Sequence, residues 1–401
     1  MSSRRVVITG AHIVSALGLE ADDSFRGLCE GGKGAGPIRF FDPTAVNTTI
    51  AYELPGDLDK TFRRYYSRRM LRQTLKYTRA GLIAARQLVE RYPVDFASLD
   101  RERIGVCCGI SGLGLYGATN DTWSVVRMMS NALPAFLTIE WDLHGLSQTI
   151  GQGETSGMEA LFTAYRLIRD GRADLMIAGG FEAACLEHVV TAFEKAGALS
   201  ADNAHPDEAC RPFDQARSGI VLGEGGAMLI LESAEHAAAR GARPLCALEG
   251  FSVGFQGRQA LAPLTEDPIV ESIQGALEAG GIPAEGIDLV VAQGNALPEG
   301  DRIEARAIAR VFGAHRPYVT ATKAAFGYCH AGGSAIDVAV AAHSLSKGIV
   351  PPLVNLTAPD PDLPALNFVA ERAIEAELRA AVVESYAIGG HHASVVMSSV
   401  A

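Results

Sequence analysis

The chain has 401 residues, 48% hydrophobic and 20% charged, which is enough material for a large buried core. Its formal net charge of −11 at pH 7 argues against a general nucleic-acid binder. The apolar run at residues 6–9 is too short for a signal peptide or a membrane span, so no membrane-spanning segment is expected.

The predicted elements, taken in chain order, alternate between apolar strand-length runs and helical patterns, which is typical of an α/β fold with a mainly parallel sheet. The predicted strands are residues 5–9, 104–108, 175–178, 228–231, 289–292, 318–320 and 395–398. The predicted helices are residues 77–91, 157–170, 235–240, 269–279, 301–312 and 335–347. The stretch 111–142 has no clean helical period and holds both tryptophans, which favours an interface or a cavity lining over an ordinary surface loop.

Two weak internal echoes suggest that the chain consists of two similar halves. The phrases IGVCCGISGLG and LVVAQGNALPEG, at residues 104–114 and 289–300, are both apolar strands that run into a glycine-bearing loop. We therefore predict halves at residues 1–245 and 246–401, with their sheets sandwiched between helices.

The seven cysteines are scattered and include no CxxC pair. This odd number suggests neither a disulfide framework nor a zinc site. Cys107 and Cys108 lie in an apolar strand and are expected to be core residues. We therefore expect a reducing, cytoplasmic location and no bound metal.

The strongest local signal is a glycine-bounded turn within residues 146–180. A strand runs into Gly151 and Gly153, then reaches Glu154, and a long helix starts near Gly157. A side chain on such a strand-to-helix turn is displayed at a helix N-terminus, where an anion is stabilised by about 0.3–1 kcal/mol. This is where a nucleophile with a lowered pKa would be placed.

The turn resembles the nucleophile elbow of β-ketoacyl-acyl carrier protein synthases, members of the thiolase superfamily. The resemblance covers essentially the whole chain, including RPFDQARSGIVLGEGGAMLILE at residues 211–232 and PPLVNL at residues 351–356. It implies a thiolase-like α/β fold in which two similar halves form a layered α-β-α-β-α sandwich, with no cofactor.

All three catalytic positions of that family are changed in this sequence. Glu154 stands where the family has its cysteine, and Gln293 and Tyr328 stand where it has two histidines. Only Lys323 is retained. Condensation needs a thiolate to carry the acyl chain and imidazole donors to stabilise the enolate. We therefore expect no independent ketosynthase activity, although Gln293 and Tyr328 could still form a weak oxyanion site.

For Glu154 and Lys323 we favour structural roles over catalytic ones. Glu154 is expected to be held by backbone amides or by a basic residue of a partner, with a chemical role as the alternative. Lys323 is expected to be a structural cation paired with a carboxylate. The family resemblance makes Glu224 the candidate partner of Lys323.

The pattern of loss resembles one subfamily, the chain length factors of type II polyketide synthases. These usually carry glutamine at the nucleophile position and keep phrases matched here by residues 304–313 and 332–352. The resemblance implies a non-elongating subunit in a polyketide or fatty-acid-like pathway. Such a subunit pairs with an active ketosynthase, serves an acyl carrier protein, and shapes the acyl tunnel at the dimer interface. Glu154 departs from the glutamine pattern.

The resemblance also places tunnel and docking residues. Two bulky aromatics that close the family's tunnel correspond to Leu113 and Asn120, which are smaller, so an open tunnel for a longer or stiff product such as a polyene is predicted. Ile388 replaces the gating phenylalanine of the family's glycine turn. A basic patch is expected either to dock the acidic carrier protein or to be a solvated helix face; its members are Arg63, Arg64, Arg68, Arg69 and Arg72.

Two other classes of function stay open from the sequence. One is a malonyl-acyl carrier protein decarboxylase that primes chain synthesis. The other is a stand-alone protein that binds acyl chains or carrier protein.

Overall fold

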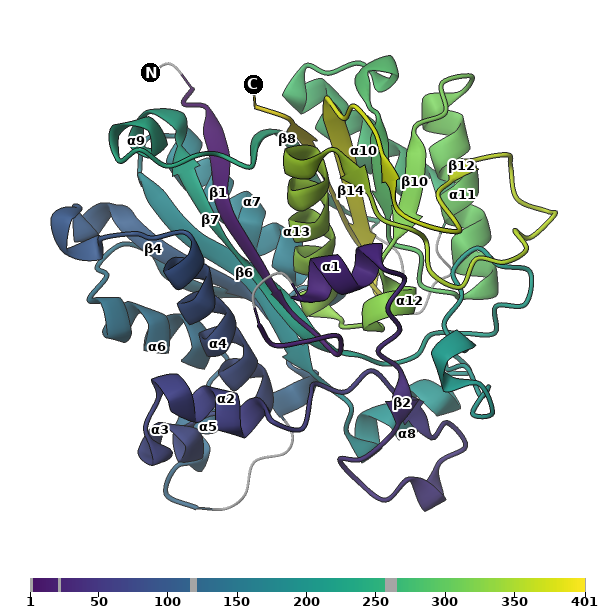
Figure 1. The fold of residues 1–401 in the computed structure, drawn as a ribbon, viewed down its shortest axis with the longest axis horizontal. Helices are drawn as coiled ribbons and strands as arrows, with labels where there is room; N and C mark the ends of the chain where they lie inside the picture. The colour runs from purple at the N-terminus through teal and green to yellow at the C-terminus, as the bar shows by residue number, and fades with distance from the viewer. Residues whose placement is uncertain (1–2, 21–22, 116–120, 257–264, 401) are drawn as a thin grey trace.

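The computed structural model describes residues 3–20, 23–115, 121–256 and 265–400. Within these residues the largest sheet has eleven strands, in the order β12-β10-β9-β14-β15-β8-β1-β7-β6-β4-β5 (Figure 1). The N-terminal strands of this sheet are β1 (Val6–Val14), β4 (Ile104–Gly109), β5 (Ser147–Ile150), β6 (Leu175–Ala183) and β7 (Glu224–Ser233). The C-terminal strands are β8 (Cys246–Phe255), β9 (Leu289–Ala292), β10 (Tyr318–Ala321), β12 (Asn367–Phe368), β14 (Ala380–Tyr386) and β15 (His391–Ser398).

The two groups of strands repeat one pairing pattern. In the first, β5, β4 and β6 are parallel, and β7 and β1 follow in antiparallel pairing. In the second, β10, β9 and β14 are parallel, and β15 and β8 follow in antiparallel pairing. The groups join where β1 pairs antiparallel with β8, for example Val6 with Leu248. The prediction of two similar halves thus agrees with the sheet, whereas the prediction of a mainly parallel sheet is wrong, because the central strands pair antiparallel.

Helices form the remaining layers of an α-β-α-β-α arrangement. Between the two groups of strands lie α7 (Ser156–Arg169) and α13 (Ala331–Lys347), and both contact strands of each group. Outside the first group lie α4 (Lys76–Arg91) and α6 (Ala132–Trp141), and outside the second lie α10 (Glu266–Gly280) and α11 (Pro298–Phe312). The predicted thiolase-like sandwich is therefore confirmed.

Shorter helices complete the chain. They are α1 (Asp23–Cys29), α2 (Leu58–Tyr65), α3 (Arg68–Gln73), α5 (Ser124–Met128), α8 (Glu187–Lys195), α9 (Ala234–Ala239) and α12 (Lys323–Phe326). Two small two-stranded sheets lie outside the main sheet, one formed by β2 (Gly36–Pro37) with β3 (Ile50–Ala51) and the other by β11 (Ile349–Val350) with β13 (Ile374–Glu375).

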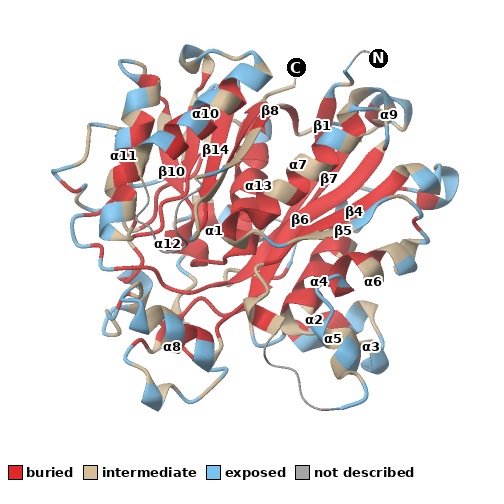
Figure 2. Ribbon diagram, turned by 180° about the vertical axis from the view of Figure 1, so that it is seen from behind, coloured by how far each residue is buried: buried red, intermediate tan, exposed pale blue. Residues whose placement is uncertain are grey.

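The central helices are buried because small residues allow close approach. Every residue of α13 from Ala331 to Leu345 is buried (Figure 2). A Cβ on Gly157 in α7 would lie 2.5 Å from the carbonyl oxygen of Ala331, so glycine is what allows α7 to reach the start of α13. This contact positions the candidate site, since Glu154 precedes α7 and Tyr328 precedes α13.

The predicted strands and helices are all present, most of them longer than predicted. Strands β8, β12 and β14 of the main sheet were not predicted. Cys107 and Cys108 are buried in β4, as expected of core residues. No helix among the described residues is long and apolar enough to cross a membrane. We propose the boundary between the halves at residues 245 and 246, just before β8.

Candidate functional site

Glu154 lies on a short 3-10 turn, Gly153–Thr155, between β5 and α7. Gly153 adopts a φ of 64°, a left-handed conformation that favours glycine, and this bends the chain from the strand into the helix. The Glu154 side chain points inward and is only 6% exposed. The turn therefore displays a buried acid at the position where the resemblance predicts the family's nucleophile.

Donors from two distant segments converge on the Glu154 carboxylate. The Tyr328 hydroxyl donates to Oε1 at 2.8 Å, and the Ile388 backbone N–H donates to Oε2 at 3.2 Å. The ring atom Nδ1 of His330 lies 3.7 Å from Oε1. The Ser334 hydroxyl donates to the Glu154 carbonyl oxygen at 2.8 Å and thereby ties the turn to α13.

These neighbours keep the acid ionised despite its burial. Burial opposes ionisation of Glu154, but His330 and the Tyr328 hydroxyl outweigh it, so the pKa of the carboxyl falls below its ordinary value. Burial and the negative charge of Glu154 raise the pKa of Tyr328. At neutral pH the site therefore holds a carboxylate and a protonated phenol.

Gln293 follows β9 and is bound to a different neighbour. Its Nε2 donates to the Tyr386 carbonyl oxygen at 3.3 Å. The Tyr386 hydroxyl donates to Glu304 Oε2 at 3.0 Å, and the same oxygen accepts from the Gly294 N–H at 2.9 Å. Gln293 thus supports the end of β14, two residues before Ile388.

Lys323 forms a buried ion pair with Asp337 of α13. The suggestion of Glu224 as its partner is wrong, because Glu224 pairs instead with Lys76 at the start of α4. The Thr322 hydroxyl also donates to Asp337, at 2.6 Å. Lys323 meets Asp337 because of how α12 packs against α13. This packing is set by the tertiary structure and has no signal in the sequence.

Three acids, Asp301, Glu304 and Glu384, are buried in the C-terminal half. Burial, reinforced by the charge of Glu304, raises the pKa of Glu384 well above its ordinary value. Burial likewise raises the pKa of Glu304, and burial with the charge of Glu304 raises that of Asp301 to about 7. The folded chain therefore retains carboxyl protons that the unfolded chain releases.

Glu384→Gln is expected to stabilise the chain at pH 8 more than at pH 5. A raised folded pKa means that stability is complete below the unfolded pKa and falls as the pH rises toward the folded pKa. A neutral amide removes this loss, by up to about 1.4 kcal/mol for each pH unit of the window. Urea unfolding at both pH values measures the difference. If Glu384→Gln destabilises the chain equally at pH 8 and at pH 5, the raised pKa of Glu384 is contradicted.

The proposed gate residues lie at different places. Leu113 is in a 3-10 turn, Leu113–Leu115, and packs on a buried cluster that includes Val189 and Tyr328. Asn120 lies outside the described residues. Ile388 is 58% exposed and lines a largely apolar cavity of about 530 Å³ together with Tyr328.

The five arginines of the predicted basic patch are all exposed, on α2 and α3. The Arg69 guanidinium lies 5.4 Å from the ring centre of Trp123, and Arg64 pairs with Glu20 at 2.6 Å. The placement is compatible with a docking face and with a solvated one.

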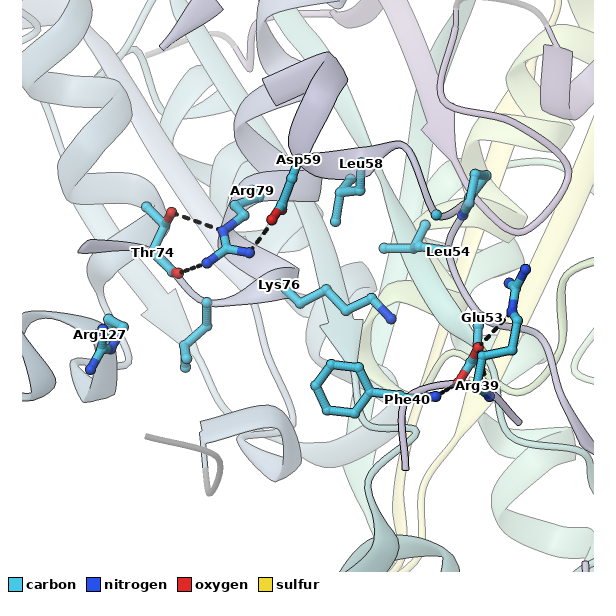
Figure 3. Close-up of a pocket in the computed structure, with 13 residues that line it drawn as sticks. Arg39, Phe40, Glu53, Leu54, Leu58, Asp59, Thr74, Lys76, Arg79 and Arg127 are labelled. Carbon is cyan, nitrogen blue, oxygen red and sulfur yellow. Dashed lines mark hydrogen bonds and ion pairs between the residues drawn. The ribbon is translucent and has the colours of Figure 1, made fainter. Parts of the chain in front are cut away.

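Beside this patch lies a second cavity, of about 510 Å³ (Figure 3). Four cations line it, and each already pairs with a carboxylate: Arg39 with Glu53, Lys76 with Glu224, Arg79 with Asp59, and Arg127 with Asp121. The cavity thus offers no excess of positive charge from these four side chains.

Comparison with known proteins agrees with this architecture. Residues 3–237 match the N-terminal domain of β-ketoacyl synthases, and residues 245–357 match their C-terminal domain. The chain belongs to the β-ketoacyl synthase family. It is 31% identical to 3-oxoacyl-[acyl-carrier-protein] synthase 2 of Coxiella burnetii, with 100% of both chains covered. It is 30% identical to a putative polyketide β-ketoacyl synthase 1 of Streptomyces halstedii, covering 99% of this chain and 98% of that one.

Solved β-ketoacyl synthase structures show the same fold. The ishigamide ketosynthase/chain length factor superposes with a TM-score of 0.91 at 28% identity, covering 100% of both chains. A β-ketoacyl synthase from Burkholderia phymatum gives a TM-score of 0.89 at 27% identity, covering 99% of this chain and 100% of that one.

Sequence reasoning missed His330 as a member of this synthase-like site. Its ring contacts Tyr328 and Phe193, with ring centres 5.0 and 5.3 Å away. Its φ is 46°, an unusual left-handed conformation for histidine, and this conformation brings it beside Glu154. The available signal was a histidine two residues after Tyr328, the position where the resemblance predicts a catalytic histidine.

Proposed function

We propose that this chain is a chain length factor, the non-elongating partner of an active ketosynthase. It would serve a type II polyketide or fatty-acid-like pathway, with a polyene as a fitting product. In the complex it would shape the acyl tunnel at the dimer interface, and an acyl carrier protein would deliver the chain. Arg63, Arg68 and their neighbours would contribute to carrier docking.

The observation that carries this proposal is the fixed carboxylate at the nucleophile position. Glu154 has both oxygens occupied by donors, and its acyl anhydride would hydrolyse readily, so it is no substitute for a thiolate. Cys329, beside Tyr328, is no replacement either. Its thiol is buried and donates to the Phe326 carbonyl oxygen at 3.3 Å, and burial raises its pKa.

Two further observations favour a paired subunit. The solved neighbour described as a ketosynthase/chain length factor matches over the full length of this chain. Strand β5 ends the main sheet, and its neighbourhood exposes apolar side chains, with Val125 at 74%, Met128 at 53% and Ile139 at 76% exposed. Exposed apolar patches of this kind mark protein interfaces.

The alternative of a malonyl decarboxylase is less favoured by the charge of the site. Glu154 is ionised and would repel the malonyl carboxylate. No specific observation favours a stand-alone binding protein.

Co-expression with a ketosynthase that carries the family's cysteine and both histidines tests the proposal. We expect native mass determination to show a complex of one copy of each subunit. Chain elongation should require both subunits together with the acyl carrier protein. Alanine in place of the partner's cysteine should abolish elongation, since this chain supplies no thiolate. The isolated chain should neither elongate nor release carbon dioxide from malonyl-carrier protein. A stable homodimer that does not bind the ketosynthase would refute the proposal. Release of carbon dioxide by the isolated chain would refute it as well.

A further inference from the structure

The Glu154 carboxylate sits in a set of donors that has the composition of a ligand site. An N–H from Ile388, a hydroxyl from Tyr328 and the His330 ring approach it from segments 174 and 234 residues away in the chain. A backbone N–H and a side-chain O–H aimed at one point are what proteins use to bind a carboxylate or a developing oxyanion. Here the chain itself supplies the anion.

The same donors border the cavity of about 530 Å³, because Tyr328 and Ile388 both line it. Its other walls are largely apolar and include Phe193, Ile220 and Ile303. A pocket with apolar walls and a few convergent polar groups is the usual design of a small-molecule site. The carboxylate of Glu154 therefore accepts hydrogen bonds from two residues that line this cavity, Tyr328 and Ile388.

Glu154 also holds the turn that borders the cavity. Ile388 is followed by Gly389 and Gly390, with φ of 98° and 92°, so the turn has a conformation that few other residues adopt. The Gly390 N–H donates to the Ala387 carbonyl oxygen at 3.1 Å, which closes the turn on itself. The bond from the Ile388 N–H to Glu154 joins the turn to the elbow.

We infer that Glu154 is an internal ligand, which fills a small-carboxylate site formed by Ile388, Tyr328 and His330. This inference deepens the proposed function and rests on it. With Glu154 bound to these donors, they are not left to bind an oxygen atom of a substrate, as expected of a non-elongating subunit. Glu154 is thus a positioning residue that holds the Ile388 turn, and the site that it fills has donors for one carboxylate group.

Glu154→Ala in the full-length chain tests the inference by chemical rescue. The substitution removes a CH2–COO⁻ group, and acetate supplies the same group from solution. We expect the variant to melt several degrees below the wild type in sodium chloride. Sodium acetate at equal ionic strength should restore most of that loss in a saturable way, and it should leave the wild type unchanged. The rescue should fade in acid, where acetate becomes protonated.

Two further variants keep the test decisive. Glu154→Ala combined with Tyr328→Phe should lose the acetate response, because one donor to the carboxylate is gone. If Glu154→Ala is insoluble, refolding yield with and without acetate replaces the melting temperature, and Tyr328→Phe alone should still melt below the wild type. Equal acetate shifts in the wild type and in Glu154→Ala, or a Glu154→Ala chain as stable as the wild type, would overturn the inference.

The failure of this inference is distinguishable from failure of the proposed function. Native mass of the complex with the ketosynthase reports pairing without reference to acetate. Pairing without acetate rescue would overturn the internal ligand alone. Rescue without pairing would overturn the proposed function and leave the carboxylate site in place.

Discussion

Leu113→Phe is expected to shorten the product of the reconstituted pair by at least one two-carbon unit. The family resemblance predicts that Leu113 stands where a bulky aromatic closes the tunnel, and its side chain packs against a cluster that includes Tyr328 and Val189. A phenyl ring adds volume to a wall that the proposed growing chain must pass. Mass spectrometry of the released chains measures the length distribution.

The matched control is Leu115→Phe. Leu115 lies in the same 3-10 turn but packs on the cluster around α4, together with Leu75. It adds the same ring at the same turn, so it controls for a general disturbance, and product length should stay that of the wild type. An unchanged length distribution for Leu113→Phe in a fully active pair would show that this wall does not measure the chain.

Periodicity and apolar runs predict much of this fold because the strands lie between helical layers. Strand β9 is a continuous apolar run, buried at all positions, and its predicted bounds are those observed. Strand β14 was missed because its sequence, AAVVESY, includes a buried Glu384 that only tertiary burial beside Glu304 explains. The antiparallel centre of the sheet was missed because pairing direction depends on connections between distant segments.

The sequence predicted which positions form the candidate site, but it did not predict which atoms contact each other there. Spacing places Glu154 on the elbow, and the structure puts Tyr328 beside it. The sequence could not show that the Ile388 N–H faces the same carboxylate, because backbone donors have no sequence signature. Nor could it place His330, whose left-handed φ depends on the loop before α13. The unusual glutamate is thus explained by donors that only the folded chain assembles.

Lys323→Met is expected to destabilise the chain by about 3–5 kcal/mol, because it leaves Asp337 buried without its cation. Lys323 is 2% exposed and Asp337 is fully buried, so water cannot replace the ammonium group. Burial already raises the pKa of Asp337, and loss of Lys323 would raise it further and force the acid to fold protonated. Urea unfolding of the isolated variant measures the cost.

The double variant Lys323→Met with Asp337→Leu should recover a large part of that loss, since no buried charge then remains without a partner. Lys347→Met is the matched control, because Lys347 is an exposed lysine at the end of α13, the helix that carries Asp337, and its loss should change stability by less than about 0.5 kcal/mol. If Lys323→Met instead keeps full stability while the pair with the ketosynthase loses elongation, Lys323 has a chemical role. Retained elongation with lost stability assigns it to the framework, and that is the outcome expected of a subunit whose nucleophile position holds Glu154.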